Sequence, residues 1–177
     1  IYMPDLIPVP YNDESLDIFV KNIDFVQNFL DQAILIENPS SYIQYTNSTY
    51  TEHEFLVNLC KKTDASILLD VNNIFVSSVN HGWDAQEYLL SIPVELIKEI
   101  HLAGHSTSEL SDKSSLLVDT HDNYVCVDVW LLYQKLIDTI KKQKLKMPYV
   151  LIEWDENIPP LEELLKEAQK AKNYAII

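Results

Sequence analysis

The sequence contains very little glycine and no arginine. Only Gly82 and Gly104 are present, where average usage of about 7% would give roughly twelve glycines in a chain of this length. All thirteen basic residues are lysines, and 27 acidic residues leave a formal net charge of −14. Such a chain lacks the basic surface that neutralises phosphates, so we expect no nucleic-acid partner and no anionic membrane partner.

Long hydrophobic runs and paired cysteines are also missing. No apolar run approaches the ~20 residues that span a bilayer, and no basic segment followed by an apolar stretch marks a signal peptide at the start. Cys60 and Cys126 lie far apart and form no CxxC pair, so we expect reduced cysteines in a cytoplasmic protein. The chain begins with Ile1 rather than Met, which we interpret as a fragment or a processed piece.

Helical and strand-like segments alternate along the chain. Apolar residues make up 47% of the 177 residues, enough for a sizeable core. Apolar residues recur at helical spacing in five segments, namely 14–30, 51–62, 84–91, 127–142 and 161–172. Thr51 and Glu54 have the spacing of a capping box at the start of one of these helices.

Short apolar runs lie between the helical segments, and we expect them to be parallel strands that are buried on both faces. They occupy residues 33–38, 66–73, 98–105, 115–122 and 149–155. The alternation predicts one α/β domain over residues 1–177 with a parallel sheet. Only eleven residues, 105–115, separate the third run from the fourth, which is near the minimum for a parallel crossover, so we expect a loop or a very short helix there.

Each strand-like run ends in a side chain that can bind a metal ion. In chain order these are Glu37, Asp70, His101, Asp119 and Glu153. Ligands of parallel α/β proteins bind at the carboxyl ends of the strands, so we expect these side chains to meet at one end of the sheet. Clustered carboxylates would repel one another unless a cation lay among them. Oxygen and imidazole donors without thiolate suit iron, manganese or zinc better than copper(I).

Several neighbouring side chains could complete such a site. His121 follows Asp119 by two residues, so strand alternation would put both on the same side. Either Asn72 or Asn73 could ligate through its amide oxygen, and Asp155 suits an outer-sphere or proton-transfer role. His81 and His105 are each either site residues or loop histidines that bond to the backbone.

The blocks ENPSSY, LLDVNNIFVSSVNHGWD, EIHLAGH, DTHD and LIEWD, taken together, resemble an uncharacterised bacterial family that includes the methanobactin biosynthesis oxidase MbnB. The resemblance runs from about Leu6 to Ala171. It implies a TIM-type (β/α)8 barrel similar to xylose isomerases. A barrel of this type needs about 250 residues, so the chain would supply about five βα units, strands 4 to 8, and the N-terminal three strands would be absent. Open sheet edges of this kind would favour a homo-oligomer.

The resemblance also implies a function and a site. Characterised members hold two or three irons, use dioxygen to modify cysteine in ribosomally made peptides, and often work with a small partner protein. Carried over by motif, the implied metal ligands are Glu37, Asp70, Asn73, His101, Asp119, His121 and Glu153. His105, Asp155 and His81 are then candidates for moving protons.

We therefore expect a metal-dependent oxidative enzyme, with multinuclear iron, that modifies cysteine in a peptide, or a fragment of such an enzyme. Two alternatives remain open. One is a divalent-metal sugar isomerase or hydrolase on the same fold, which would work without dioxygen. The other is a non-catalytic fragment that acts only through self-association or by binding a partner.

Overall fold

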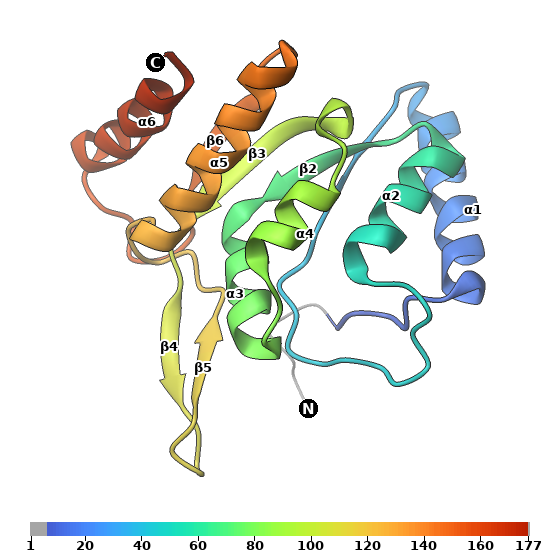
Figure 1. The fold of residues 1–177 in the computed structure, drawn as a ribbon, viewed down its shortest axis with the longest axis horizontal. Coiled ribbons are helices and arrows are strands. Elements are labelled where there is room, and N and C mark those ends of the chain that lie inside the picture. Colours follow the sequence, from blue (N-terminus) through green and yellow to red (C-terminus); the bar gives the residue numbers. More distant parts are fainter. Residues whose placement is uncertain (1–6, 177) are drawn as a thin grey trace.

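All five predicted helices are present in the computed structural model, which describes residues 7–176 (Figure 1). They are α1 (Asp13–Leu30), α2 (Glu52–Thr63), α4 (Ala85–Ser91), α5 (Val127–Gln143) and α6 (Leu161–Ile176). Thr51 and Glu54 form the predicted capping box of α2. None of the helices within this range is both long and apolar enough to cross a bilayer. Residues 1–6 and 177 of the predicted domain fall outside the described part.

The central sheet is parallel and has four strands. These are β1 (Leu35–Glu37), β2 (Ser66–Asp70), β3 (Ile97–Ala103) and β6 (Tyr149–Glu153), paired in the order β1-β2-β3-β6. The carboxyl ends are aligned by the register, in which Asp70 pairs with His101, and Ala103 with Glu153. The predicted α/β fold with a parallel sheet is confirmed.

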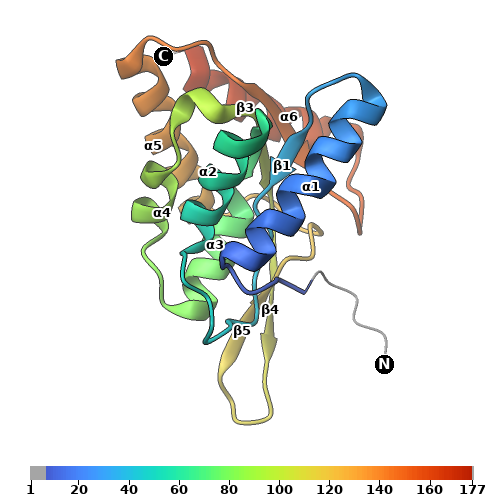
Figure 2. The same cartoon turned by 90° about the vertical axis from the view of Figure 1, so that its right-hand side faces the viewer.

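The run at 115–122 does not join this sheet, so the prediction of five parallel strands is wrong at this position. Its strand β5 (Ser115–Val118) pairs antiparallel with β4 (Ser106–Glu109) in a separate two-stranded ribbon. Eleven residues are too few for a helical crossover but ample for a hairpin turn, which closes through Leu110 N and Ser114 O at 2.8 Å. The ribbon projects from the body of the protein (Figures 1 and 2).

A helix that the sequence pattern does not reveal follows β2 directly. Helix α3 spans Val71–His81. Its first residues, up to Asn73, belong to the run that the sequence analysis assigned to a strand. The chain turns at once because the Asp70 side chain caps the helix, accepting a hydrogen bond from Asn73 N at 2.7 Å. Gly82 ends the helix in the left-handed conformation, with φ of 72°.

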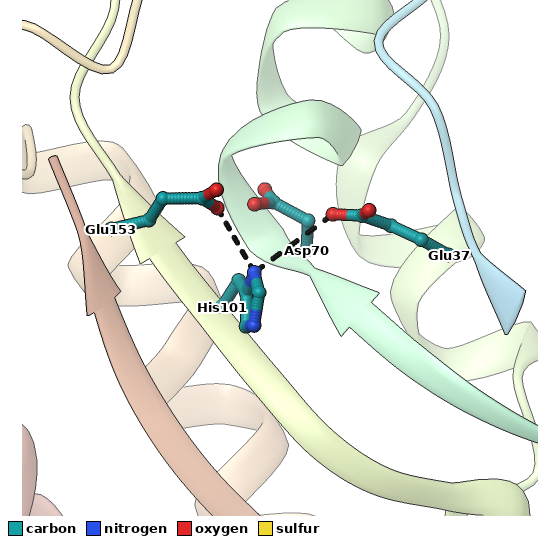
Figure 3. Close-up of side chains that lie close together, drawn as sticks. All are labelled: Glu37, Asp70, His101 and Glu153. Atoms are coloured by element: carbon teal, nitrogen blue, oxygen red, sulfur yellow. Dashed lines mark hydrogen bonds and ion pairs between the residues drawn. The ribbon is translucent and has the colours of Figure 1, made fainter. Parts of the chain in front are cut away.

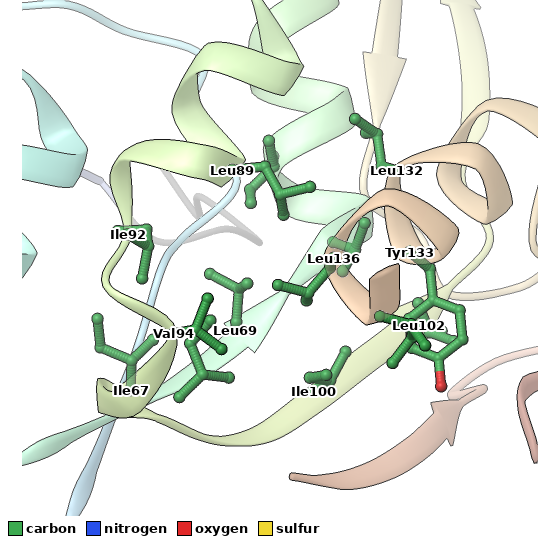
Figure 4. Packing of buried hydrophobic residues seen from close by; sticks show 14 of the residues in the cluster. Ile67, Leu69, Leu89, Ile92, Val94, Ile100, Leu102, Leu132, Tyr133 and Leu136 are labelled. Atoms are coloured by element: carbon green, nitrogen blue, oxygen red, sulfur yellow. The ribbon is translucent and has the colours of Figure 1, made fainter. Parts of the chain in front are cut away.

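Only one face of the sheet is fully covered, contrary to the expectation of strands that are buried on both faces. Helices α3, α4 and α5 pack on Ile67, Leu69, Ile100 and Leu102 (Figure 4). The alternate side chains of β2 and β3, such as Leu68 and His101, are only half-buried. In β6, Tyr149 and Leu151 are exposed. The sheet therefore presents a second face that no helix of the described chain seals.

Candidate metal centre

Four side chains at the strand ends come together as the sequence predicts. Glu37, Asp70, His101 and Glu153 each offer one ligand atom, and these atoms all lie within 4.8 Å of one another (Figure 3). The side chains come from β1, β2, β3 and β6 respectively. Parallel pairing places the ends of all four strands at one edge, which explains the convergence of residues more than a hundred positions apart.

His101 lies at the centre of this group. Its Nδ1 is 2.9 Å from Glu153 Oε2 and 3.9 Å from Glu37 Oε1, while its Nε2 is 3.3 Å from Glu99 Oε1. The hydrogen bond with Glu153 raises the pKa of His101 to about 9, although burial opposes this shift. Glu99 precedes His101 by two residues, so strand alternation could have indicated it, but the sequence analysis missed it.

Asp70 is fully buried at the end of β2. Its Oδ1 accepts the capping hydrogen bond from Asn73 N, whereas its Oδ2 has no hydrogen-bond partner among residues 7–176. Burial raises the pKa of Asp70 to about 8. A buried carboxylate oxygen without a donor is costly, and a cation beside it removes that cost. The residues present therefore fit a metal ion at this position.

A second group of ligands forms around the loop after β5. His121, Glu153 and Asp155 bring three ligand atoms within 4.8 Å of one another. His121 Nδ1 lies 3.2 Å from Asp155 Oδ2 and 3.6 Å from Glu153 Oε2. Burial lowers the pKa of His121, but the nearby carboxylates of Asp119 and Glu153 outweigh this effect and raise the pKa to about 11. The hydrogen bond with His101 and the nearby His121 ring lower the pKa of Glu153 to about 2.

Asp119 and His121 do lie together, but not through strand alternation. Strand β5 ends at Val118, and His121 adopts a left-handed conformation with φ of 47°. The turn brings His121 Nε2 to 2.8 Å from Asp119 Oδ1. Asp155 N donates to His121 O at 2.8 Å, which ties this loop to the segment after β6. Asp119 thus contacts the outer nitrogen of His121 and belongs to neither group of converging ligand atoms.

The two asparagines of α3 have different surroundings. Asn73 is buried, donates from Nδ2 to Asn38 O at 3.0 Å, and keeps an Oδ1 without a hydrogen-bond partner among the described residues. Asn72 donates to Asp119 Oδ1 at 2.6 Å, and its Oδ1 lies 2.7 Å from His105 Nδ1. Asn72 therefore links His105 to Asp119, which in turn contacts His121. Ligation by Asn73, which the resemblance implies, stays a prediction.

The three candidates for proton transfer occupy different places. Asp155 is in contact with His121, and His105 reaches the centre through Asn72. His81 lies apart from both ligand groups, since its Nε2 is 2.9 Å from Ser41 Oγ and its ring packs on Trp83. Their catalytic roles stay predictions.

Asn38 is a further residue that the sequence analysis missed. It is fully buried, accepts a hydrogen bond from Asp70 N at 2.9 Å and donates to Asp70 O at 2.8 Å. This reciprocal pair fixes the end of β1 against the end of β2. Its position directly after Glu37 is the only sequence signal for it.

Comparisons with known proteins find a matching family and several relatives of this chain. A family model described as "RiPP precursor modification enzyme MbnB/TglH/ChrH" matches residues 1–176. A UPF0276 protein of Vibrio vulnificus is 44% identical over 171 residues, which cover 97% of this chain and 57% of that protein. A UPF0276 protein of Rhizorhabdus wittichii is 47% identical, with 97% and 58% covered, and one of Caulobacter vibrioides is 42% identical, with 95% and 56% covered. The chain thus spans less than two thirds of the length of these relatives.

Proposed function

Because the chain belongs to the family of RiPP precursor modification enzymes that includes MbnB, TglH and ChrH, we propose that it forms the metal-binding part of an oxidative enzyme that modifies cysteine in a ribosomally made peptide. The observation that carries the proposal is the convergence of Glu37, Asp70, His101 and Glu153, with a buried Asp70 oxygen that no described residue satisfies. The activity is that of the whole protein, whose relatives are longer than this chain.

The donor set supports a centre of at least two ions. Glu153 belongs to both ligand groups and suits a bridging role, because its two neighbours His101 and His121 approach the same oxygen from different segments. Carboxylate and imidazole donors without thiolate suit iron, with manganese or zinc as substitutes. Iron, when bound, would supply electron transfer to dioxygen. A complement of two or three irons is the number we expect.

The chain's own residues would orient the ligands and move protons. Glu99 contacts Nε2 of His101, and Asp119 contacts Nε2 of His121. Carboxylates in such positions help to orient the histidine rings at metal sites. Asn72 in turn holds Asp119 and joins it to His105. Asp155 is the exposed member of its group, with 63% of its side chain open to solvent. This exposure suits a role in passing a proton between His121 and water.

We further propose that the open face of the sheet lines the inside of a TIM-type (β/α)8 barrel in the whole protein. Helices cover the other face, and the prospective ligands lie on the side that they leave open. Tyr149 and Leu151 on that side are 77% and 42% exposed, and among the described strands β1 and β6 each have one edge without a partner strand. Such edges also favour association, with further copies of this chain or with a small partner protein.

The test is metal analysis joined to an oxidation assay on the whole protein. We expect purified protein to contain iron, and a cysteine-containing precursor peptide to change mass only when dioxygen is present. Asp70→Asn should lose the metal, whereas Asp112→Asn, which alters an exposed hairpin residue, should keep it. Absence of any bound transition metal would contradict the proposal. Full activity without dioxygen, with magnesium or zinc, would point to an isomerase or hydrolase.

A further inference from the structure

A cavity of about 450 Å³ lies beside α2 and α4, and none of the predicted metal ligands lines it. Its walls come from the segment before α1, the loop that joins β1 to α2, the connection between α3 and α4, and the first turns of α2 and α4. This loop is the same segment that leaves the metal centre after Glu37. The proposed chemistry at the metal centre gives this cavity no role.

The floor of the cavity presents hydrogen-bond acceptors. Glu52 is only 4% exposed, and its Oε2 accepts from the Tyr11 hydroxyl at 2.7 Å while its Oε1 accepts from the Tyr88 hydroxyl at 2.8 Å. Each phenol has a single proton and donates it to Glu52. The phenol oxygens therefore offer only lone pairs to anything else that enters. A ligand that meets these three residues must supply the donors.

The rim of the cavity is negatively charged. Asp84 and Glu87 line the cavity, and no lysine is among its described lining residues. Asp84 Oδ1 caps α4 by accepting from Gln86 N and Glu87 N, and its Oδ2 has no hydrogen bond within the described part of the chain. His53 also lines the cavity, but burial lowers its pKa, which favours the uncharged ring at neutral pH. The cavity therefore attracts positive charge.

Aromatic rings supply the remaining walls. Trp83 and Tyr88 are stacked, with ring centroids 6.4 Å apart and an interplanar angle of 20°, and Tyr45 and Tyr50 also line the cavity. Aromatic faces attract cations, and they also pack against the methylene stem that carries a charged group. Acceptors, carboxylates and ring faces together match an organic cation rather than a bare metal ion.

We propose that this cavity binds a basic side chain, lysine or arginine, of the peptide on which the protein acts. The identity of the ligand as a peptide rests on the proposed function, whereas the preference for a cation rests on the cavity alone. The loop from Glu37 to Glu52 connects the two sites. A basic side chain held at one end of this loop would anchor the peptide while another part of it reaches the metal centre.

The test measures binding of small probes to the metal-free 177-residue chain by NMR titration. The probes are the N-acetyl methylamides of arginine, lysine and the uncharged analogue norleucine. We expect both cationic probes to bind at least about fivefold more tightly than norleucine, and the arginine and lysine arms to show which head group is preferred. Glu87→Gln and Trp83→Leu should each weaken cation binding roughly two- to fivefold. The matched control is Glu162→Gln, in the first turn of α6, which should change nothing.

Two results would overturn the inference: equal binding of norleucine, or cation binding that neither Glu87→Gln nor Trp83→Leu changes. The metal-free condition separates this test from the proposed function. Asp70→Asn should keep the cation site while it loses the metal. If the protein binds cations here but never binds a transition metal, the proposed function fails and the cavity remains a cation site without an assigned peptide.

Discussion

His101 Nδ1 lies 2.9 Å from Oε2 of Glu153, and this contact joins the carboxyl end of β3 to that of β6. The two residues are 52 positions apart, and parallel pairing of their strands brings them together. Glu153 also approaches His121, so one carboxylate is shared by both groups of prospective ligands. The arrangement gives Glu153 the largest expected influence on metal binding.

Glu153→Gln should lower metal affinity at least about tenfold, because an amide removes the negative charge from the shared position. The measurement is metal content after dialysis against a competing chelator. Glu156→Gln, at an exposed position in the loop three residues after Glu153, is the control and should retain metal. Equal metal retention by the two variants would contradict a bridging role for Glu153.

Tyr88→Phe should destabilise the protein in a pH-dependent manner. Burial raises the pKa of Glu52 above 4.5, and the hydrogen bonds from Tyr11 and Tyr88 oppose this shift. The stabilising contribution of this carboxyl is therefore full below its ordinary pKa and is lost as the pH rises through its raised value in the folded state. Removal of the Tyr88 hydroxyl takes a hydrogen bond from the charged Glu52 carboxylate. We therefore expect the free energy of unfolding to fall by about 1.5–3 kcal/mol at pH 7 and by less at pH 4.

Tyr133→Phe provides the comparison for this effect. Its hydroxyl is also buried but donates to Ala171 O, a neutral carbonyl, at 3.2 Å. We expect a loss of about 1 kcal/mol that is the same at both pH values. Urea unfolding at pH 4 and pH 7 measures both variants. A Tyr88→Phe loss that does not depend on pH would show that Glu52 keeps one protonation state across the range.

The two glycines should differ sharply in their tolerance of alanine. A Cβ on Gly104 would collide with the carbonyl of Asn123, a backbone group that cannot move aside cheaply. Gly104→Ala should cost about 3 kcal/mol or more and separate the end of β3 from the loop that carries His121.

Gly82 has φ of 72°, and a Cβ added to it would meet nothing within 4 Å, so Gly82→Ala should cost only about 1–2 kcal/mol. Thermal unfolding of the two variants is the measurement, and equal losses would contradict the close approach at Gly104.

Asn80→Ala should loosen the β4–β5 ribbon without unfolding the domain. Asn80 on α3 donates to Leu117 O and accepts from Leu117 N, each at 2.9 Å, so one side chain holds the inner edge of β5. Hydrogen exchange at residues 106–118 should become faster. Asn28→Ala, an exposed position on α1, should leave it unchanged. Unaltered exchange in Asn80→Ala would show that the ribbon is held by other contacts.

Much of the fold follows from local patterns. The five helices with a clear amphipathic stripe are predicted within a few residues, and so is the capping box of Thr51 and Glu54 at α2, because capping and periodicity are properties of neighbouring residues. Helix α3 is missed because its first turn reads as a continuation of a buried strand. What starts it is the Asp70 side chain, which could equally have served as a metal ligand alone.

The candidate site divides in the same way. Glu37, Asp70, His101 and Glu153 are predictable because each ends an apolar run, and parallel strands end at one edge. Spacing alone could not decide whether Asn72 or Asn73 takes part in the site. The role of Asn72 depends on its contacts with Asp119 and His105, which come from distant segments. Glu99 and Asn38 gave a signal only through their proximity in sequence to a ligand.

The sequence by itself determined where the five amphipathic helices lie and that Glu37, Asp70, His101 and Glu153 stand at strand ends, because these features depend on period and on near neighbours. Tertiary structure alone decided that SLLV forms a hairpin rather than a fifth parallel strand, that Glu153 lies between His101 and His121, and that Tyr11 and Tyr88 meet over Glu52. These outcomes depend on which segments pack together, and packing is a property of the whole chain rather than of any stretch within it.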